Sequence, residues 1–528
     1  MGAFSASGGS SAEQHEAAKR LQFSPISDNM SSSLDITAQS PEESPHHRSY
    51  ERHPSLTELM PDAMIGEILS RLPDMRDLAR AKLVNTSFRE SSAYVKYVKF
   101  LCRQRNVLRG PGQNGECLVP FKEIVTSNLK TVKCVERLRL EIEDEMQANR
   151  YKDENNEKNS LWLTEDKFVM QWLPLVSATL QNLTVIDYGQ QAIFHPTPLL
   201  QHLSHLCKQL RTLELRNMFL DCSPKQCGTT KDQITQTRLK DVSTLTLRCV
   251  KLTENGLDDL NTVMPNLKTL TLVTVVGLKD AKFVSEHLQV LCLGLATKVK
   301  SVKLVVKQLI KLQLKMACPE ELKVIAPNLR CLAVCMDKRP DTKVEFECVN
   351  DLRELLMGAS EFSTLHDLCK HNRQLEKVFL DVPCMAFEDN GGWKGVLPHV
   401  NLKNLPDMKH ITSYCTQLHT LSVGPGLWHA LEQDMMKNPD VFCPTWPNLT
   451  RLILHLIVQV IDVSIKLLKA LVDAIPTLKT LEVYVHKDSK VDTQEFQQLK
   501  ETVKELVPRV DLKLDSWKKG LKFECFSF

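Results

Sequence analysis

The last four residues form the one short motif in this chain whose residue type and position predict a covalent modification. They are Cys525-Phe526-Ser527-Phe528, and Lys518, Lys519 and Lys522 stand just before them. A cysteine fourth from the end with a final Phe has the form of a geranylgeranylation signal. Ser527 occupies a position that usually holds an aliphatic residue, so a chance match is the alternative interpretation. Prenylation of Cys525 would tether the chain to membranes.

Motifs for enzymatic chemistry are not found. The sequence holds no GxxxxGK[ST] phosphate loop, HExxH zinc motif or GxSxG nucleophile elbow, and its 16 histidines show no metal-ligand spacing. Its 17 cysteines include no CxxC pair, which disfavours a disulfide framework and a zinc knuckle. We therefore expect a protein that is not an enzyme, that needs no metal or cofactor, and that keeps reduced thiols in the cytoplasm and/or nucleus.

Composition and charge fit a soluble globular protein. Of the 528 residues, 42% are hydrophobic and 25% are charged, and the formal net charge is +3. A charge this small does not predict bulk electrostatic binding to nucleic acid. The longest apolar stretch, 452–468, is interrupted by polar and charged residues, so we expect no membrane span. We therefore expect membrane association only if Cys525 is prenylated.

One leucine phrase recurs along most of the chain, in the order leucine, two residues, leucine, one residue, leucine or valine. Clear copies are PNLKTLTL (265–272), PNLRCLAV (327–334), PNLTRLIL (447–454) and PTLKTLEV (476–483). Anchor residues at 242, 267, 288, 309, 329, 352 and 375 are 25, 21, 21, 20, 23 and 23 residues apart. This period is close to that of leucine-rich repeats, in which each unit contributes one strand and one return segment.

The repeat predicts the fold class. Stacked units bury their leucines in a shared core, so we expect an α/β solenoid with a curved parallel sheet and helical or irregular outer segments. The spacing from Leu375 to Leu418 is larger, and we interpret the intervening VNLKNLPDM as a degenerate unit. The predicted solenoid covers 135–528, with irregular repeats.

Residues between the leucines of a phrase should lie on the concave face of the sheet, because side chains alternate along a strand. Basic side chains at such positions predict binding of an acidic or phosphorylated target segment through charge-assisted hydrogen bonds. The alternative is that these are ordinary solvated strand positions. The candidates are Arg216, Arg248, Lys311, Lys315, Arg451 and His455.

The region before the repeats divides into three predicted parts. Residues 1–54 hold 12 serines and only 15 hydrophobic residues, which predicts a disordered head. Residues 55–104 predict three short helices. The first starts at Pro61 and ends at Pro73, Asp74 caps the second, and Ser87 with Glu90 opens a third that carries Val95, Val98 and Cys102. Residues 105–134 are interpreted as a linker or cap.

The stretch MPDAMIGEILSRLPDMRDLARAKLVNTSFRE (60–90) resembles an F-box. The matching positions are Pro61, Ile68, Leu69, Leu72, Pro73, Leu78, Val84 and Arg89. Asn85 replaces the usual cysteine of that motif, and Phe88 replaces the usual tryptophan. Followed by leucine-rich repeats, the motif makes the whole chain resemble an F-box/leucine-rich-repeat protein.

The resemblance implies a substrate receptor of an SCF-type ubiquitin ligase. In such an assembly the F-box docks on a Skp-family adaptor, and through it on a cullin, while the repeats bind a target protein. Two alternatives stay open. The helices could merely cap the first repeat, leaving an interaction scaffold, or the concave face could hold a small molecule as a co-receptor does. The expected adaptor-binding residues are Pro61, Ile65, Ile68, Leu69, Leu72, Pro73, Leu78, Val84 and Phe88.

Overall fold

The computed structural model describes thirteen parts of the chain, all within one compact unit, Ser55–Phe528. These parts are 60–72, 74–103, 120–143, 162–187, 190–223, 238–336, 342–359, 362–382, 406–437, 444–458, 460–486, 489 and 493–517. The predicted disordered head, the prolyl position Pro73 and the cysteine Cys525 lie outside the described residues.

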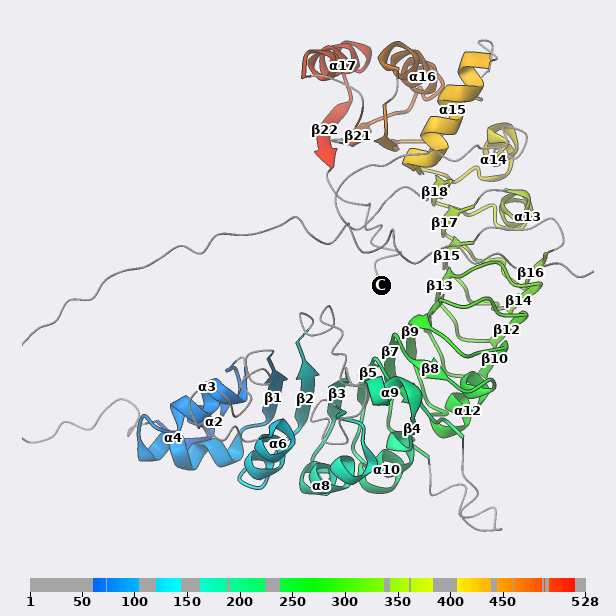
Figure 1. Ribbon diagram of the computed structural model, residues 1–528. Coiled ribbons are helices and arrows are strands. Elements are labelled where there is room, and N and C mark those ends of the chain that lie inside the picture. The colour runs from blue at the N-terminus through cyan, green and yellow to red at the C-terminus, as the bar shows by residue number, and fades with distance from the viewer. Residues whose placement is uncertain are drawn as a thin grey trace, which may run out of the picture. The chain divides into compact units, whose positions relative to one another are not determined.

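A 15-stranded sheet runs through the described residues, and its neighbouring strands pair in parallel (Figure 1). Neighbouring strands follow one another in chain order, as stacked repeats require. The strands are β1 (Tyr97–Cys102), β2 (Arg137–Ile142), β3 (Asn182–Ile186), β5 (Thr212–Arg216), β7 (Thr244–Arg248), β9 (Thr269–Val275), β11 (Val290–Leu295), β13 (Lys311–Lys315), β15 (Cys331–Cys335), β17 (Glu354–Gly358), β18 (Lys377–Asp381), β19 (Thr420–Val423), β20 (Arg451–Leu456), β21 (Thr480–His486) and β22 (Asp511–Trp517).

The leucine phrase builds this sheet as predicted. In PNLKTLTL the three leucines, Leu267, Leu270 and Leu272, are buried, while Thr269 and Thr271 between them are half-buried on the opposite side of β9. Each buried leucine contributes roughly 1.5–3 kcal/mol relative to exposure. The solenoid class is therefore confirmed. We call the side that carries the residues between the leucines the open face.

Helices form most of the return segments, and α6, α8 and α10 lie on one side of the first strands (Figure 1). In α8 the buried residues fall at helical spacing, with Phe168, Trp172 and Val176 facing the core. The helices after the N-terminal region are α6 (Phe121–Leu129), α8 (Asp166–Val176), α9 (Gln190–Phe194), α10 (Leu199–Leu206), α12 (Gly256–Val263), α13 (Ser363–His371), α14 (Met408–Tyr414), α15 (Pro425–Lys437), α16 (Ile461–Asp473) and α17 (Thr493–Leu506).

In the middle of the solenoid the return segments are strands instead. A second parallel sheet joins β10 (Asp280–Ser285), β12 (Ser301–Val306), β14 (Glu321–Ile325) and β16 (Lys343–Glu347). In β12 residues Val302, Leu304 and Val306 are buried at period two, which favours a strand over a helix. A shorter sheet joins β4 (Pro196–Thr197), β6 (Phe219–Leu220) and β8 (Lys251–Leu252).

The predicted degenerate unit between Leu375 and Leu418, VNLKNLPDM, lies mostly outside the described residues. Strand β18 pairs directly with β19, from Lys377 opposite Thr420 to Leu380 opposite Val423. The chain after β19 begins α15, and the buried carboxylate of Asp381 accepts hydrogen bonds from the Gly426 and Leu427 N–H groups at its start. In the described sheet no strand lies between β18 and β19.

Asparagine side chains tie successive units together. The Asn of three leucine phrases donates from Nδ2 to a backbone carbonyl of the preceding unit: Asn266 to Lys240, Asn328 to Lys307 and Asn448 to Thr416, at 2.9, 2.9 and 2.7 Å. The phrase thus encodes a polar link as well as an apolar core. No role for these asparagines was predicted from the sequence.

The N-terminal region 60–94 contains α2 (Asp62–Leu69), α3 (Met75–Ala81), α4 (Thr86–Ser91) and the short 3-10 helix η1 (Ser92–Tyr94). Asp74 caps α3 as predicted, because its carboxylate accepts from the N–H groups of Arg76 and Asp77. The cap of α4 is Asn85, whose Oδ1 accepts from the Phe88 N–H at 2.7 Å. Asparagine is among the best N-cap residues, so this departure from the F-box pattern supports the helix.

The predicted third helix is wrong at its start, where Asn85 rather than Ser87 is the cap, and beyond residue 94. Val98 and Cys102 lie in strand β1, where Val98, Phe100 and Cys102 are buried and the residues between them are half-buried. The pattern therefore has the period of two that is typical of a strand, although 95, 98 and 102 also fit a helix face. Strand β1 pairs with β2, so the solenoid begins at Tyr97 rather than at residue 135.

The cap at Asn85 yields a testable expectation. An N-cap Asn replaced by alanine typically costs about 1 kcal/mol, which corresponds to a roughly five-fold increase in local opening. We expect Asn85→Ala to raise amide hydrogen exchange of α4, measured by mass spectrometry on the peptide that contains Phe88. Asn85→Ser retains an acceptor and should exchange at nearly the native rate. Identical exchange in the alanine variant and the native chain would exclude the capping role.

Candidate functional site

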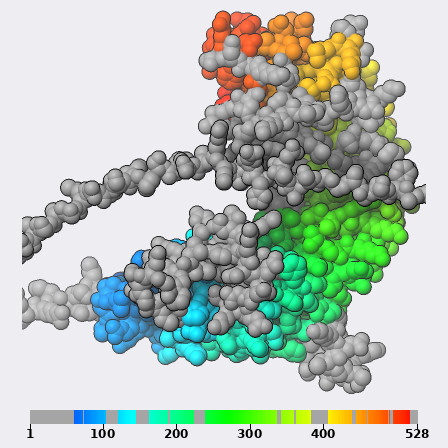
Figure 2. Space-filling view, viewed as in Figure 1, coloured from blue at the N-terminus to red at the C-terminus, as the bar shows by residue number. Residues whose placement is uncertain are grey.

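Four apolar side chains of the three-helix region are exposed to solvent. Met64 and Ile68 of α2 are 55% and 48% exposed, and Leu83 and Val84, between α3 and α4, are 80% and 66% exposed. We call them the exposed apolar set. Figure 2 shows the three helices in blue beside the cyan atoms of α6. Covering one such side chain with a partner recovers half or more of the roughly 1.5–3 kcal/mol of full burial, so the set is suited to protein binding.

The predicted adaptor-binding residues differ in how far they are buried. Ile65, Leu69 and Leu78 are buried in the core of the chain itself, so in the free chain they are not exposed to a partner. Leu72 and Phe88 are half-buried and pack against the same core. The remaining described candidates, Pro61, Ile68 and Val84, are exposed.

Two members of the exposed apolar set were missed by the sequence analysis. Met64 lies one residue before the predicted helix face, and Leu83 follows α3 in a turn. The helical period identified one apolar face of α2 without showing that Ile65 and Leu69 point inward. The sequence held one indication of an exposed apolar surface, which was an apolar residue just outside that face, such as Met64.

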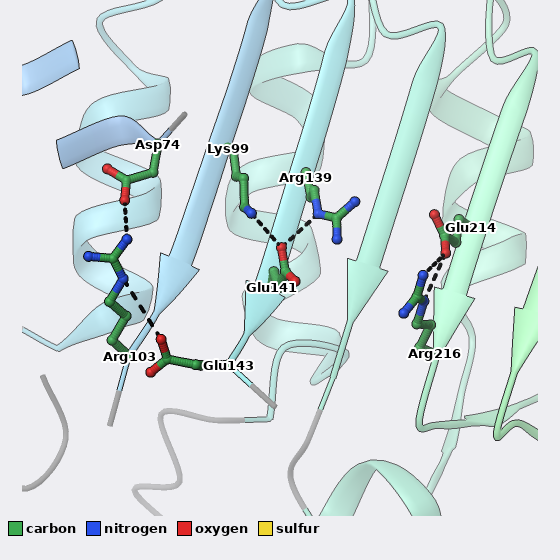
Figure 3. A network of polar contacts seen from close by, with 8 residues as sticks. All are labelled: Asp74, Lys99, Arg103, Arg139, Glu141, Glu143, Glu214 and Arg216. Carbon is green, nitrogen blue, oxygen red and sulfur yellow. Dashed lines mark hydrogen bonds and ion pairs between the residues drawn. The ribbon is translucent and has the colours of Figure 1, made fainter. Parts of the chain in front are cut away.

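The open face of the first strands carries a network of ion pairs (Figure 3). The Glu141 carboxylate accepts from Arg139 Nε at 2.7 Å and lies 2.9 Å from Lys99 Nζ. Burial alone would raise the pKa of Glu141, but the hydrogen bonds from Arg139 and Lys99 outweigh it and hold that pKa below its ordinary value. One carboxylate thus pairs with two cations, so these three residues keep one unbalanced positive charge.

A second pair in Figure 3 joins the helices to the sheet. Arg103, which follows β1, donates from Nη2 to Asp74 Oδ2 at 3.0 Å, and its Nε lies 4.0 Å from Glu143 Oε1. The other carboxylate oxygen of Asp74 caps α3. One carboxylate thus orders a helix terminus and anchors that helix beside the first strand.

Two predicted target-binding residues, Arg216 and Arg248, are direct register partners on β5 and β7. They differ in charge pairing. Arg216 donates to Glu214 Oε1 from Nε and Nη2, at 2.8 and 2.6 Å. Among the described residues, nothing accepts a hydrogen bond from Arg248 Nε, although that atom is buried. Of the two, Arg248 is therefore the better candidate to receive an external anion.

The other four predicted binding residues lie elsewhere on the sheet. Lys311 and Lys315 begin and end β13, which is three strands beyond β7, or about 14 Å at ordinary strand spacing. Arg451 and His455 lie on β20, a further five strands away. The six candidates therefore form three separate groups rather than one site.

The group on β20 is unsuited to attracting an anion. Arg451 donates from Nε to Glu482 Oε1 at 2.8 Å, and Tyr484 donates to Oε2 of the same carboxylate at 2.7 Å. The His455 ring stacks on Tyr484 with centroids 5.1 Å apart. Burial lowers the pKa of His455 to about 4, so its imidazole is neutral near pH 7.

The described parts of the chain lack two other kinds of feature, a cluster of metal ligands and a membrane-spanning helix. Within the described parts of the chain, no group of three or more His, Cys, Asp or Glu side chains could hold a metal ion. In the same parts, no helix is both long enough and apolar enough to cross a membrane.

A buried carboxyl in α15 predicts a pH dependence of stability. Glu432 is 2% exposed and accepts hydrogen bonds from Trp428 Nε1, at 2.8 Å, and from Ser464. Burial raises the pKa of Glu432 to about 7 from an ordinary value of 4.5. Between these values the folded chain holds a proton that the unfolded chain releases. Stability therefore falls as pH rises through this window, by roughly 3 kcal/mol in total.

We expect Glu432→Gln to remove this dependence while keeping an acceptor for Trp428 and Ser464. The variant should match the native chain in thermal unfolding at about pH 5 and unfold at a higher temperature at about pH 8. Exposed Glu123→Gln serves as the control and should retain the native pH profile. A Glu432→Gln profile that parallels the native one would contradict the assignment.

The fold and its N-terminal helices define a leucine-rich-repeat solenoid preceded by a small F-box-like region. Over 328 residues the chain is 25% identical to the F-box/LRR-repeat protein At4g29420 of Arabidopsis thaliana. The match covers 62% of this chain and 70% of that protein. No family model matches the chain. The comparison confirms the resemblance to F-box/leucine-rich-repeat proteins.

Proposed function

We propose that this chain is a non-catalytic substrate-recognition subunit of an SCF-type ubiquitin ligase. The three-helix region docks on a Skp-family adaptor, which connects it to a cullin, and the repeats bind a target protein for ubiquitination. The observation that carries this proposal is the exposed apolar set on the helices that resemble an F-box. Apolar side chains kept at the surface are costly for solubility and favourable for binding.

The junction between helices and repeats supports the same role. Because Arg103 pairs with Asp74 and β1 follows η1 directly, the helices are attached to the first strand of the solenoid without a long connection. A rigid attachment suits a receptor that must hold its target in a fixed place while other subunits carry out the chemistry. Target binding is assigned to the open face, where Arg248 is the preferred cation.

Co-purification tests the proposal. The unmutated full chain is expressed with a Skp-family adaptor and a cullin, and the three proteins are expected to elute as one complex. Absence of any complex would refute the ligase role and leave an interaction scaffold. Proximity labelling under proteasome inhibition would then identify the target, which is expected in the cytoplasm and/or nucleus, where a fluorescent fusion of the chain should also be seen.

A further inference from the structure

Strands β5 and β7 end beside a surface that combines apolar side chains with cations. It consists of Ile193 and Phe194 of α9, Phe219 of β6, Lys251 of β8 and Arg248 at the end of β7. We call this surface the aromatic rim. It is separate from the exposed apolar set of the N-terminal helices.

The cations of the aromatic rim have no carboxylate partner among the described residues. Arg216, next to Arg248 in register, is held by Glu214, whereas the buried Arg248 Nε has no acceptor. The Lys251 ammonium lies over the Phe219 ring, 4.4 Å from its centroid, and no described carboxylate pairs with it. Neither cation therefore has an ion-pair partner among the described residues that would offset its charge at close range.

The apolar part of the rim is attached to the same strand ends. After β5 the chain turns at Asn217, and after β7 at Cys249, with φ values of 59° and 52°. These turns lead into β6 and β8, where Phe219 and Lys251 are direct register partners. Helix α9 contacts β6, and its Ile193 and Phe194 are 45% and 69% exposed.

We infer that the aromatic rim binds a segment of the target protein in which an acidic residue lies close to a large apolar residue. The inference rests on the proposed function and names the chemistry of the target. A carboxylate of that segment accepts from Arg248 and neutralises Lys251, while the apolar side chain covers Phe194. Charge complementarity argues for this partner, because neither cation of the rim pairs directly with a described carboxylate.

A random peptide library displayed on phage is the probe. It is panned on the unmutated full chain, and enriched sequences are expected to place Asp or Glu within a few residues of Phe, Leu or Trp. Synthetic versions of these peptides should bind Arg248→Ala and Phe194→Ala at least about ten-fold more weakly than the native chain, because one hydrogen-bonded charge or one anchor is lost. Fluorescence anisotropy measures this affinity.

Matched substitutions elsewhere provide the controls. Arg137→Ala removes an exposed arginine elsewhere on the open face, and Met170→Ala removes a 44% exposed side chain of α8. Both variants should bind the peptides as the native chain does. The inference is overturned if no acidic-apolar sequence is enriched, if the rim variants bind as well as the controls, or if the rim variants dissolve a self-associated form of the chain, which would identify a second copy as the occupant.

A double variant of the adaptor-binding region tests the proposed ligase role and the assignment of the aromatic rim separately. Ile68→Asp with Val84→Asp should leave peptide binding unchanged, because neither residue belongs to the rim. Peptide binding without adaptor binding in the native chain would refute the proposed ligase role alone. Adaptor binding by the native chain, combined with peptide affinities that the rim substitutions leave unchanged, would refute the assignment of the rim alone.

Discussion

Substituting Ile68→Asp and Val84→Asp together is expected to weaken binding to a Skp-family adaptor by at least about 100-fold. Ile68 is 48% exposed and Val84 is 66% exposed in the free chain, so a partner that covers each adds about half to two thirds of the roughly 1.5–3 kcal/mol of full burial. Loss of both removes about 2–3 kcal/mol, and a factor of ten in affinity corresponds to about 1.4 kcal/mol. Burying a new carboxylate adds a further penalty. Isothermal titration of the full chain with purified adaptor measures the change.

The control is a double substitution of comparable exposure on the solenoid. Met170→Asp and Leu175→Asp on α8 start from side chains that are 44% and 38% exposed. This control should bind the adaptor with native affinity, and both double variants should retain the native circular dichroism. Equal weakening by the two variants would show that added negative charge, rather than loss of the apolar set, disturbs binding. Ile65→Asp is unsuitable as a test, because Ile65 is fully buried and its substitution would disrupt the helices.

Replacing Asn372 with alanine is expected to destabilise the repeats around β17 and β18 by about 3–5 kcal/mol. The side chain is fully buried. Its Oδ1 accepts from the Leu352 N–H, and its Nδ2 donates to the carbonyls of Val349 and Leu368, each at 2.9 Å. Alanine leaves Leu352 N–H and Val349 C=O without these partners, and each orphaned buried group costs about 1–3 kcal/mol. Urea unfolding followed by hydrogen exchange of these strands measures the loss.

Asn328→Ala is the matched control for Asn372. Asn328 also donates to a carbonyl of the preceding unit, at 2.9 Å, but that bond is exposed to solvent. Water can replace it, so we expect a cost of at most about 1 kcal/mol. A similar loss of stability in both variants would argue against burial as the source of the Asn372 effect.

The sequence predicted the parts of this fold that depend on apolar periodicity. The leucines of PNLKTLTL define β9 and its buried side, because strand alternation and burial give the same pattern. Asp74 was recognised as a cap, since an acidic residue before a short helix has a local role. These features are set by neighbours within a few residues.

The missed features depend on contacts between distant segments. The second sheet was not predicted from the sequence, because the pairing of β12 with β10 and β14 joins separate units of the chain. Val98 satisfies a helical pattern and a strand pattern equally, and pairing with β2 decides between them. Periodicity alone could not have resolved either case, because both outcomes bury the same residues.

The candidate site was predictable only in part, for the same reason. Ile65 and Ile68 share one apolar run, and only the packed helices show that the first is buried and the second exposed. Arg216 and Arg248 have equivalent positions in their phrases, but Glu214 neutralises only Arg216. Charge pairing depends on which side chains are close together in the folded chain, and the leucine phrase does not determine this.

Hydrogen exchange on adaptor binding tests the central claim most directly. The full chain is exchanged alone and in the presence of a saturating Skp-family adaptor. We predict added protection in peptides that cover 61–91, which contain the exposed apolar set, and unchanged exchange in β7 to β21. Protection confined to the repeats, or no protection anywhere under conditions that saturate a known F-box protein, would contradict the assignment of these helices as the adaptor-binding region.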